Sequence, residues 1–221
     1  MKKILIFVLA FVCVGNLFAN SVEEDVLEAT NTLQKLTLNK NTIPKKIMQQ
    51  ARAIVVVPSS IKVSFFVGGK YGEGVASIKK SNNQWSNPFF VTLGSGSLGF
   101  QLGVESADSL FVFRTQNSVD ELLKQKFTLG VGASVSAGPM GVNVEKNSEI
   151  NMKAEIFSYS QTSGLFAGAS FEGASIANND GKNRALYGGN MNVRKIVQMD
   201  KKSDIYSINE FLKQVMNSTS K

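Results

Sequence analysis

The feature that most constrains this chain is a run of five apolar residues, from Ala53 to Val57, of which four are β-branched. Pro58 ends the run. β-Branched residues favour extended backbone, and a run that is apolar at every position is typical of a strand buried within a sheet. We therefore expect a β-rich domain built around this segment.

Further extended segments follow, and turns rich in glycine, asparagine or serine separate most of them. The glycine-rich segment 68–72 is the first predicted turn, and the alternation of apolar with small or polar residues over 98–104 is typical of a strand. The predicted strands cover residues 61–67, 74–78, 89–93, 98–104, 109–114, 149–159 and 165–176.

The clearest alternation lies between Phe127 and Ala137, where every second residue is apolar and the residues between them are Thr, Gly or Ser. A period of two is that of a strand with one buried face. The pattern predicts one strand over 127–137, ended by Gly138-Pro139.

Capping boxes mark three predicted helices. In this pattern a Ser side chain bonds to an amide of the first turn, and a Glu three residues later bonds back. The three pairs are Ser21 with Glu24, Ser118 with Glu121, and Ser207 with Glu210. The internal helix is predicted over 119–126, and a further short helix begins near Pro44, since proline suits the first helical turn.

Both terminal helices carry an apolar stripe at helical spacing. The N-terminal stripe consists of Val22, Val26, Ala29, Leu33 and Leu36. The C-terminal helix, predicted at about 207–217, has a stripe of Ile208, Phe211, Leu212, Val215 and Met216. The predicted fold class is α+β: mainly an antiparallel β-sheet or sandwich with N-terminal helices, one internal helix and a C-terminal helix.

The N-terminus has the composition of a secretory signal peptide. Lys2 and Lys3 precede an apolar run over 4–14, and a small residue, Ala19, precedes an acidic segment. Such a run is shorter than the roughly 20 residues that a spanning helix needs. We expect residues 1–19 to be a signal peptide cleaved after Ala19, and residues 20–221 to form a single domain in the periplasm, either free or associated with a membrane.

The residue types of the chain limit its chemistry. It contains no histidine, and its one cysteine, Cys13, lies inside the predicted signal peptide. Catalytic triads and the usual zinc sites require these residues. Segment 94–99 matches G-x-G-x-x-G, but a strand rather than a helix is predicted after it, so no nucleotide cofactor is expected. We therefore expect no enzymatic activity, no cofactor or metal, and no nucleic-acid partner.

Basic residues interleave with apolar ones around the second predicted helix. Lys45, Lys46 and Arg52 are the candidate contacts for lipid phosphates, because a basic amphipathic segment can lie on an anionic bilayer. An ordinary helix that docks on the sheet and leaves its lysines in solvent would show the same pattern. The residues alone leave these two interpretations open.

Taken in order, seven segments of the chain resemble the SYLF domain, also called the Ysc84 actin-binding-like domain. The resemblance covers about residues 30–188 and is carried by several short motifs in register. These are Ala51 to Pro58, the glycine-rich turn Val67 to Val75, Trp85-Ser86-Asn87-Pro88, Gly99 to Gly103, Ser136 to Pro139, Ser158-Tyr159-Ser160 with Gly164 to Gly168, and Phe171-Glu172-Gly173.

The resemblance implies a non-enzymatic lipid-binding protein that recognises anionic phospholipid or phosphoinositide-type headgroups. Eukaryotic members of the family are associated with phosphoinositide membranes and actin. Relatives often have a basic residue after the second glycine of the segment that begins with Gly138-Pro139. In this chain that second glycine is Gly141, and Val142 follows it. The alternatives to lipid binding are a periplasmic protein-interaction or structural module, and a hydrolase that uses carboxylates alone.

Overall fold

The computed structural model describes residues 22–38, 43–65, 67–98, 103–140, 153–163, 165–200 and 203–220. The predicted signal peptide and its cleavage site lie outside these residues.

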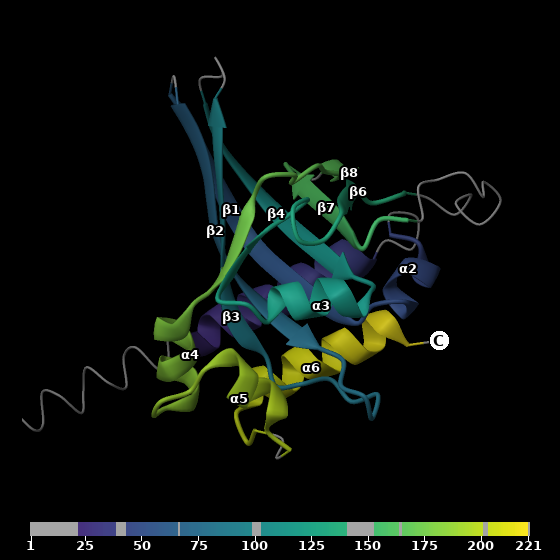
Figure 1. The fold of residues 1–221 in the computed structure, drawn as a ribbon, viewed down its shortest axis with the longest axis vertical. Coiled ribbons are helices and arrows are strands. Elements are labelled where there is room, and N and C mark those ends of the chain that lie inside the picture. The colour runs from purple at the N-terminus through teal and green to yellow at the C-terminus, as the bar shows by residue number, and fades with distance from the viewer. Residues whose placement is uncertain are drawn as a thin grey trace, which may run out of the picture.

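The described residues form one nine-stranded sheet in the order β5-β9-β3-β2-β1-β4-β7-β6, with β8 paired to β7 (Figure 1). All neighbouring strands run antiparallel except β6 and β7, which are parallel. The strands are β1 (Ala53–Phe65), β2 (Val67–Ile78), β3 (Phe89–Leu98), β4 (Gly103–Phe113), β5 (Lys126–Thr128), β6 (Val135–Ala137), β7 (Ile156–Thr162), β8 (Leu165–Gly168) and β9 (Ser175–Asn178).

Six helices accompany the sheet in the described part of the chain. The N-terminal helix covers residues 22–38. The others are α2 (Lys45–Gln49), α3 (Gln116–Leu122), α4 (Asp180–Tyr187), α5 (Val193–Gln198) and α6 (Tyr206–Thr219). The mixture of a mostly antiparallel sheet with helices at both ends of the chain confirms the predicted α+β class.

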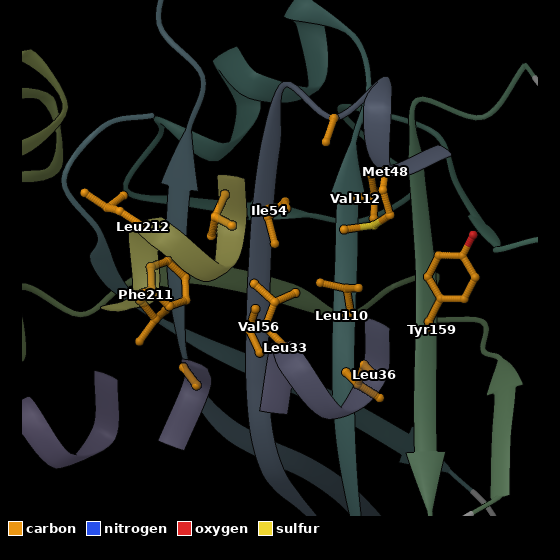
Figure 2. Close-up of a cluster of buried hydrophobic side chains, with 14 of the residues drawn as sticks. Leu33, Leu36, Met48, Ile54, Val56, Leu110, Val112, Tyr159, Phe211 and Leu212 are labelled. Atoms are coloured by element: carbon orange, nitrogen blue, oxygen red, sulfur yellow. The ribbon is translucent and has the colours of Figure 1, made fainter. Parts of the chain in front are cut away.

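The first five residues of the central strand β1 are buried on both faces of the sheet, as their apolar run predicts. Ile54 and Val56 belong to one apolar cluster, while Ala53, Val55 and Val57 belong to another. The N-terminal helix, α2 and α6 cover the first face, where Leu33, Leu36, Met48, Phe211 and Leu212 pack over the strands (Figure 2). The second face is covered by residues of α3 and α5 and by the short strands β5 and β9.

The predicted N-terminal stripe is confirmed, because all five of its residues are buried. In α6 the stripe is confirmed except at Met216, which is 46% exposed. The predicted capping boxes at 118 and 207 are wrong in register. Thr115 is the N-cap of α3 and pairs with Ser118 three residues later, and α6 begins after Ile205, so that Ser207 is buried within the helix.

Two helices were not predicted. The first is α4, which Asn179 caps with a side chain that accepts a hydrogen bond from the amide of Lys182. Asn192 caps α5 in the same way. Both helices are shorter than three turns, which leaves too few apolar residues to show a helical period.

The single strand predicted over 127–137 is also wrong. Only its ends, β5 and β6, are strands, and they pair with different partners. Between them the chain turns at Gly130, whose φ of 87° suits glycine, and the Gly130 amide donates to the Ala133 carbonyl at 2.9 Å. Alternation of small and apolar residues does not reveal such a turn, since glycine fits both structures.

The predicted end of the first strand at Pro58 is an irregularity instead. The pairing register of β1 shifts between Val57 and Ser60, and the strand then continues to Phe65. Ser59 has a φ of 45°, and its amide donates to Asp108 Oδ1 at 3.1 Å. Asp108 also accepts a bond from Lys35 at 2.8 Å, which ties the N-terminal helix to this irregularity.

A second polar contact fixes the start of the N-terminal helix. Lys182 of α4 donates to Asp25 at 2.6 Å and also to Glu73 of β2. Burial lowers the pKa of Lys182, but hydrogen bonds and charge attraction from the two carboxylates outweigh it, so that the pKa lies above its ordinary value. Three elements that are distant in sequence therefore meet at one ammonium group.

Phe211 anchors α6 on the sheet, and we expect Phe211→Ala to lower the free energy of unfolding by about 3–5 kcal/mol through lost burial and a residual cavity. Met216→Ala on the same helix removes an exposed side chain and should change it by about 0.5 kcal/mol or less. Urea unfolding of both variants measures the difference. Equal losses would mean that α6 does not pack as described.

Lys182→Met should lower the free energy of unfolding by about 1–2 kcal/mol, because two charge-assisted hydrogen bonds are lost. The exposed Lys213–Glu210 pair supplies a control, and Lys213→Met should cost well under about 1 kcal/mol. Since the folded pKa of Lys182 is raised, its contribution is complete below the unfolded pKa and disappears as the pH rises through the folded value. The gap between wild type and Lys182→Met should therefore close above about pH 10.5, and a constant gap would contradict the assignment.

Candidate functional site

The three residues predicted to contact phosphate lie at one end of the sheet, where the chain passes from α2 into β1. We name this region the basic end and define it by Lys45, Lys46 and Arg52. Lys45 and Lys46 are exposed on α2, and Arg52 is exposed immediately before β1. Figure 1 shows α2 beside the C-terminal end of α6.

The helix α2 is docked on the sheet. Ile47 and Met48 are 1% and 3% exposed and belong to the apolar cluster under the N-terminal helix. Met48 lies against Val112 of β4 (Figure 2). The apolar residues of α2 are therefore used for packing, and its lysines and Gln49 face solvent. Of the two interpretations left open above, the described structure favours a docked helix with a charged outer surface.

Backbone bonds hold Arg52 between two strands. Its amide donates to the carbonyl of Phe113 at 2.7 Å, and its carbonyl accepts from the amide of Lys79 at 2.7 Å. The guanidinium makes one weak contact, to Gln116 at 3.4 Å. The backbone is thus fixed while the charge remains exposed.

Arg114 supports the basic end from inside. Its guanidinium donates to Gln50 Oε1 at 2.9 and 3.1 Å and to the Ala154 carbonyl at 2.8 Å. It also stacks over the Phe157 ring at 4.8 Å. Burial lowers the pKa of Arg114, against a smaller opposing effect of Tyr159. These contacts fix Gln50, the residue that follows α2, so Arg114 holds the end of that helix in position.

No carboxylate among the described residues compensates the charges of the basic end. Among the described residues, Lys45, Lys46 and Arg52 form no ion pair, whereas Lys35, Lys80, Lys124, Lys182 and Lys213 each contact a carboxylate. Lys79 is a further basic residue beside Arg52, and sequence reasoning missed it. Lys79 comes directly after Ile78, which pairs with Ala53. Only the pairing register of β1 and β2 therefore brings Lys79 beside Arg52.

A pocket of about 230 Å³ lies elsewhere, beside the irregularity in β1. Asp25, Glu28 and Glu73 line it together with Tyr71 and Phe90. Its acidic lining would repel a phosphate, and its volume is below the range usual for ligand pockets. Asp25 and Glu73 are both bound by Lys182, which favours a structural ion pair over a catalytic pair of carboxylates.

Two further properties of the described residues bear on the site. No group of three or more Cys, Asp or Glu side chains there could hold a metal ion. Within those same residues, no helix combines the length and the hydropathy that crossing a bilayer requires.

Comparison with known proteins gives the family. The family model Ysc84, described as "Las17-binding protein actin regulator", matches residues 94–218 of this chain. The match covers β4, the internal helix and α6, and it does not include Lys45, Lys46 or Arg52.

Similar proteins of known sequence agree with this match. LAS seventeen-binding protein 3 of Saccharomyces cerevisiae is 32% identical over 158 residues, which is 70% of this chain and 34% of that protein. SH3 domain-containing YSC84-like protein 1 of Homo sapiens is 30% identical over 146 residues, or 66% of this chain and 42% of that protein. The chain thus spans between a third and a half of the length of these relatives. Together with the ordered SYLF motifs, the match over more than half of its residues shows that the chain belongs to the Ysc84 (SYLF) family.

Proposed function

We propose that this protein is a non-enzymatic module that binds anionic lipid headgroups on a bacterial envelope membrane through its basic end. The observation that carries the proposal is the exposure of Lys45, Lys46 and Arg52 on a fixed backbone without compensating carboxylates among the described residues. A rigid cluster of unpaired cations is attracted to a surface of negative potential.

Because α2 has its apolar residues packed inside, the proposed contact is electrostatic and shallow. Each basic residue close to an anionic surface contributes about 1 kcal/mol. Three such residues give weak binding, which added salt screens within a Debye length of about 10 Å at 0.1 M. The protein would therefore associate reversibly with the membrane surface.

The proposal places the mature protein in the periplasm, after cleavage behind Ala19. The support is the sequence of the N-terminus, with its two lysines and short apolar run. N-terminal sequencing of protein released by osmotic shock should begin at Asn20. Retention of Met1 on protein in the cytosolic fraction would contradict the location without affecting the lipid contact.

Replacing Lys45, Lys46 and Arg52 together with Ala should weaken binding to phosphatidylglycerol vesicles by about 100-fold, since about 3 kcal/mol is lost. Vesicle flotation at low salt measures the change. The control replaces Lys126, Arg184 and Lys195 with Ala, because these exposed residues on other elements give the same change in net charge.

The control variant should keep most of its binding if the basic end is the contact. An equal loss in both variants would show that net charge alone drives association. Equal recovery with neutral and anionic vesicles would reject the electrostatic contact.

A second candidate function is protein interaction. Its support is the names of the relatives, one of which is a LAS seventeen-binding protein and another an SH3 domain-containing protein. An envelope protein partner would take the place of the membrane in that case. A defined crosslinked partner in intact cells, combined with no vesicle association at low salt, would favour this function.

A further inference from the structure

A small pocket lies between the N-terminal helix and the irregularity in β1, on the face of the sheet that the terminal helices cover. We name it the acidic pocket and define it by Asp25, Glu28, Ser59, Tyr71, Glu73 and Phe90. Its volume of about 230 Å³ is too small for a drug-sized ligand but exceeds the roughly 30 Å³ that one water molecule takes up in the liquid. The pocket therefore suits a chemical group of a few heavy atoms.

The charge of the acidic pocket is negative. Asp25, Glu28 and Glu73 bring three carboxylates to the lining. Lys182 binds Asp25 and Glu73 but not Glu28. Among the described residues Glu28 forms no ion pair, and its carboxylate accepts only a long hydrogen bond of 3.5 Å from the Ser59 hydroxyl. Glu28 is therefore available to bind a further cation.

An ammonium group of the chain itself shows which cation the walls of the pocket accept. The Lys182 ammonium donates to the carboxylates of Asp25 and Glu73. Its Nζ also lies 5.6 Å from the centroid of the Phe90 ring, within the range of a cation–π interaction. Carboxylate oxygens thus take the N–H bonds of this ammonium while an aromatic ring faces its charge. The rest of the lining offers the same two kinds of partner.

The side chains around Glu28 provide further acceptors and a second ring. Ser59 and Tyr71 each present a hydroxyl oxygen, and the Tyr71 side chain is 57% exposed. The Tyr71 hydroxyl donates to Glu73 at 3.2 Å, so that its oxygen can still accept a hydrogen bond. An ammonium group beside Glu28 would therefore find one charged and two neutral acceptors next to an aromatic ring.

The acceptors select among possible cations. In the described part of the chain, no group of three or more acidic or cysteine side chains could hold a metal ion. A quaternary ammonium has no N–H group, so it could not use the carboxylate and hydroxyl oxygens as hydrogen-bond acceptors. A primary ammonium carries three N–H donors on one compact nitrogen, as Lys does. The lining matches this last group.

We propose that the acidic pocket binds a primary ammonium group, with Glu28 as its charge partner and the hydroxyls of Ser59 and Tyr71 as further acceptors. The group belongs either to a free amine or to the ethanolamine headgroup of a lipid. Ser59 lies roughly 20 Å along β1 from Arg52, so this site is separate from the basic end. Binding of a free amine does not depend on the lipid contact proposed there.

Amide NMR spectra recorded during a titration with ethanolamine test the site directly. The amides of Ser59, Gly72 and Gly74 should shift and saturate, with a dissociation constant in the millimolar range because the probe has few atoms. Choline supplies the control, since it has the same charge but methyl groups in place of the N–H donors. It should bind at least about fivefold more weakly. Shifts that do not saturate, or equal binding of choline, would overturn the proposal.

A matched pair of variants locates the charge partner. Glu28→Gln should weaken ethanolamine binding by about fivefold, since an exposed charge pair is lost while the shape of the side chain is kept. Asp120→Asn gives the same change in net charge on α3, which covers the other face of the sheet, and should leave binding unchanged. Unchanged binding in the E28Q variant, or equal weakening in both, would overturn the proposal. Circular dichroism on heating checks that both variants fold.

Two further measurements identify the source of the amine and separate this site from the basic end. Greater recovery with neutral phosphatidylcholine vesicles that contain phosphatidylethanolamine, lost in the E28Q variant, would identify the lipid headgroup. Equal recovery with and without phosphatidylethanolamine, together with saturable ethanolamine shifts, would identify a free amine. Replacing Lys45, Lys46 and Arg52 with Ala should leave the ethanolamine shifts unchanged even if it abolishes binding to anionic vesicles. Loss of the shifts in that variant would overturn the assignment to the acidic pocket.

Discussion

Burial of the first five residues of β1 on both faces of the sheet is the constraint on which the rest of the structure depends. A strand whose successive residues belong alternately to two apolar clusters needs a covering layer on each side of the sheet. The terminal helices supply one layer, although they come from opposite ends of the chain. The internal helix, α5 and the short strands β5 and β9 supply the other. Segments from both ends of the chain must therefore pack on the sheet before its central strand is removed from water.

Polar contacts fix what apolar packing leaves adjustable. An apolar stripe lets a helix slide or rotate slightly on a sheet, since the hydrophobic effect is not directional. Lys35 with Asp108 and Lys182 with Asp25 and Glu73 set the position of the N-terminal helix at two points. Arg114 does the same for the segment after α2. The buried or paired cations thus have structural roles, whereas the exposed cations of the basic end form no ion pair among the described residues.

The sequence by itself determined the class of fold and the family, and it pointed to Lys45, Lys46 and Arg52 as candidate contacts. β-Branched runs and apolar stripes express burial directly, so β1, the N-terminal helix and most of the α6 stripe could be predicted. Only the tertiary structure decided that 127–137 folds into a turn between two strands, that α2 docks by Ile47 and Met48, and that Lys79 lies beside Arg52. The physical reason is that local patterns show which residues prefer burial, whereas strand register and the choice of partner depend on contacts between segments that are far apart in the chain.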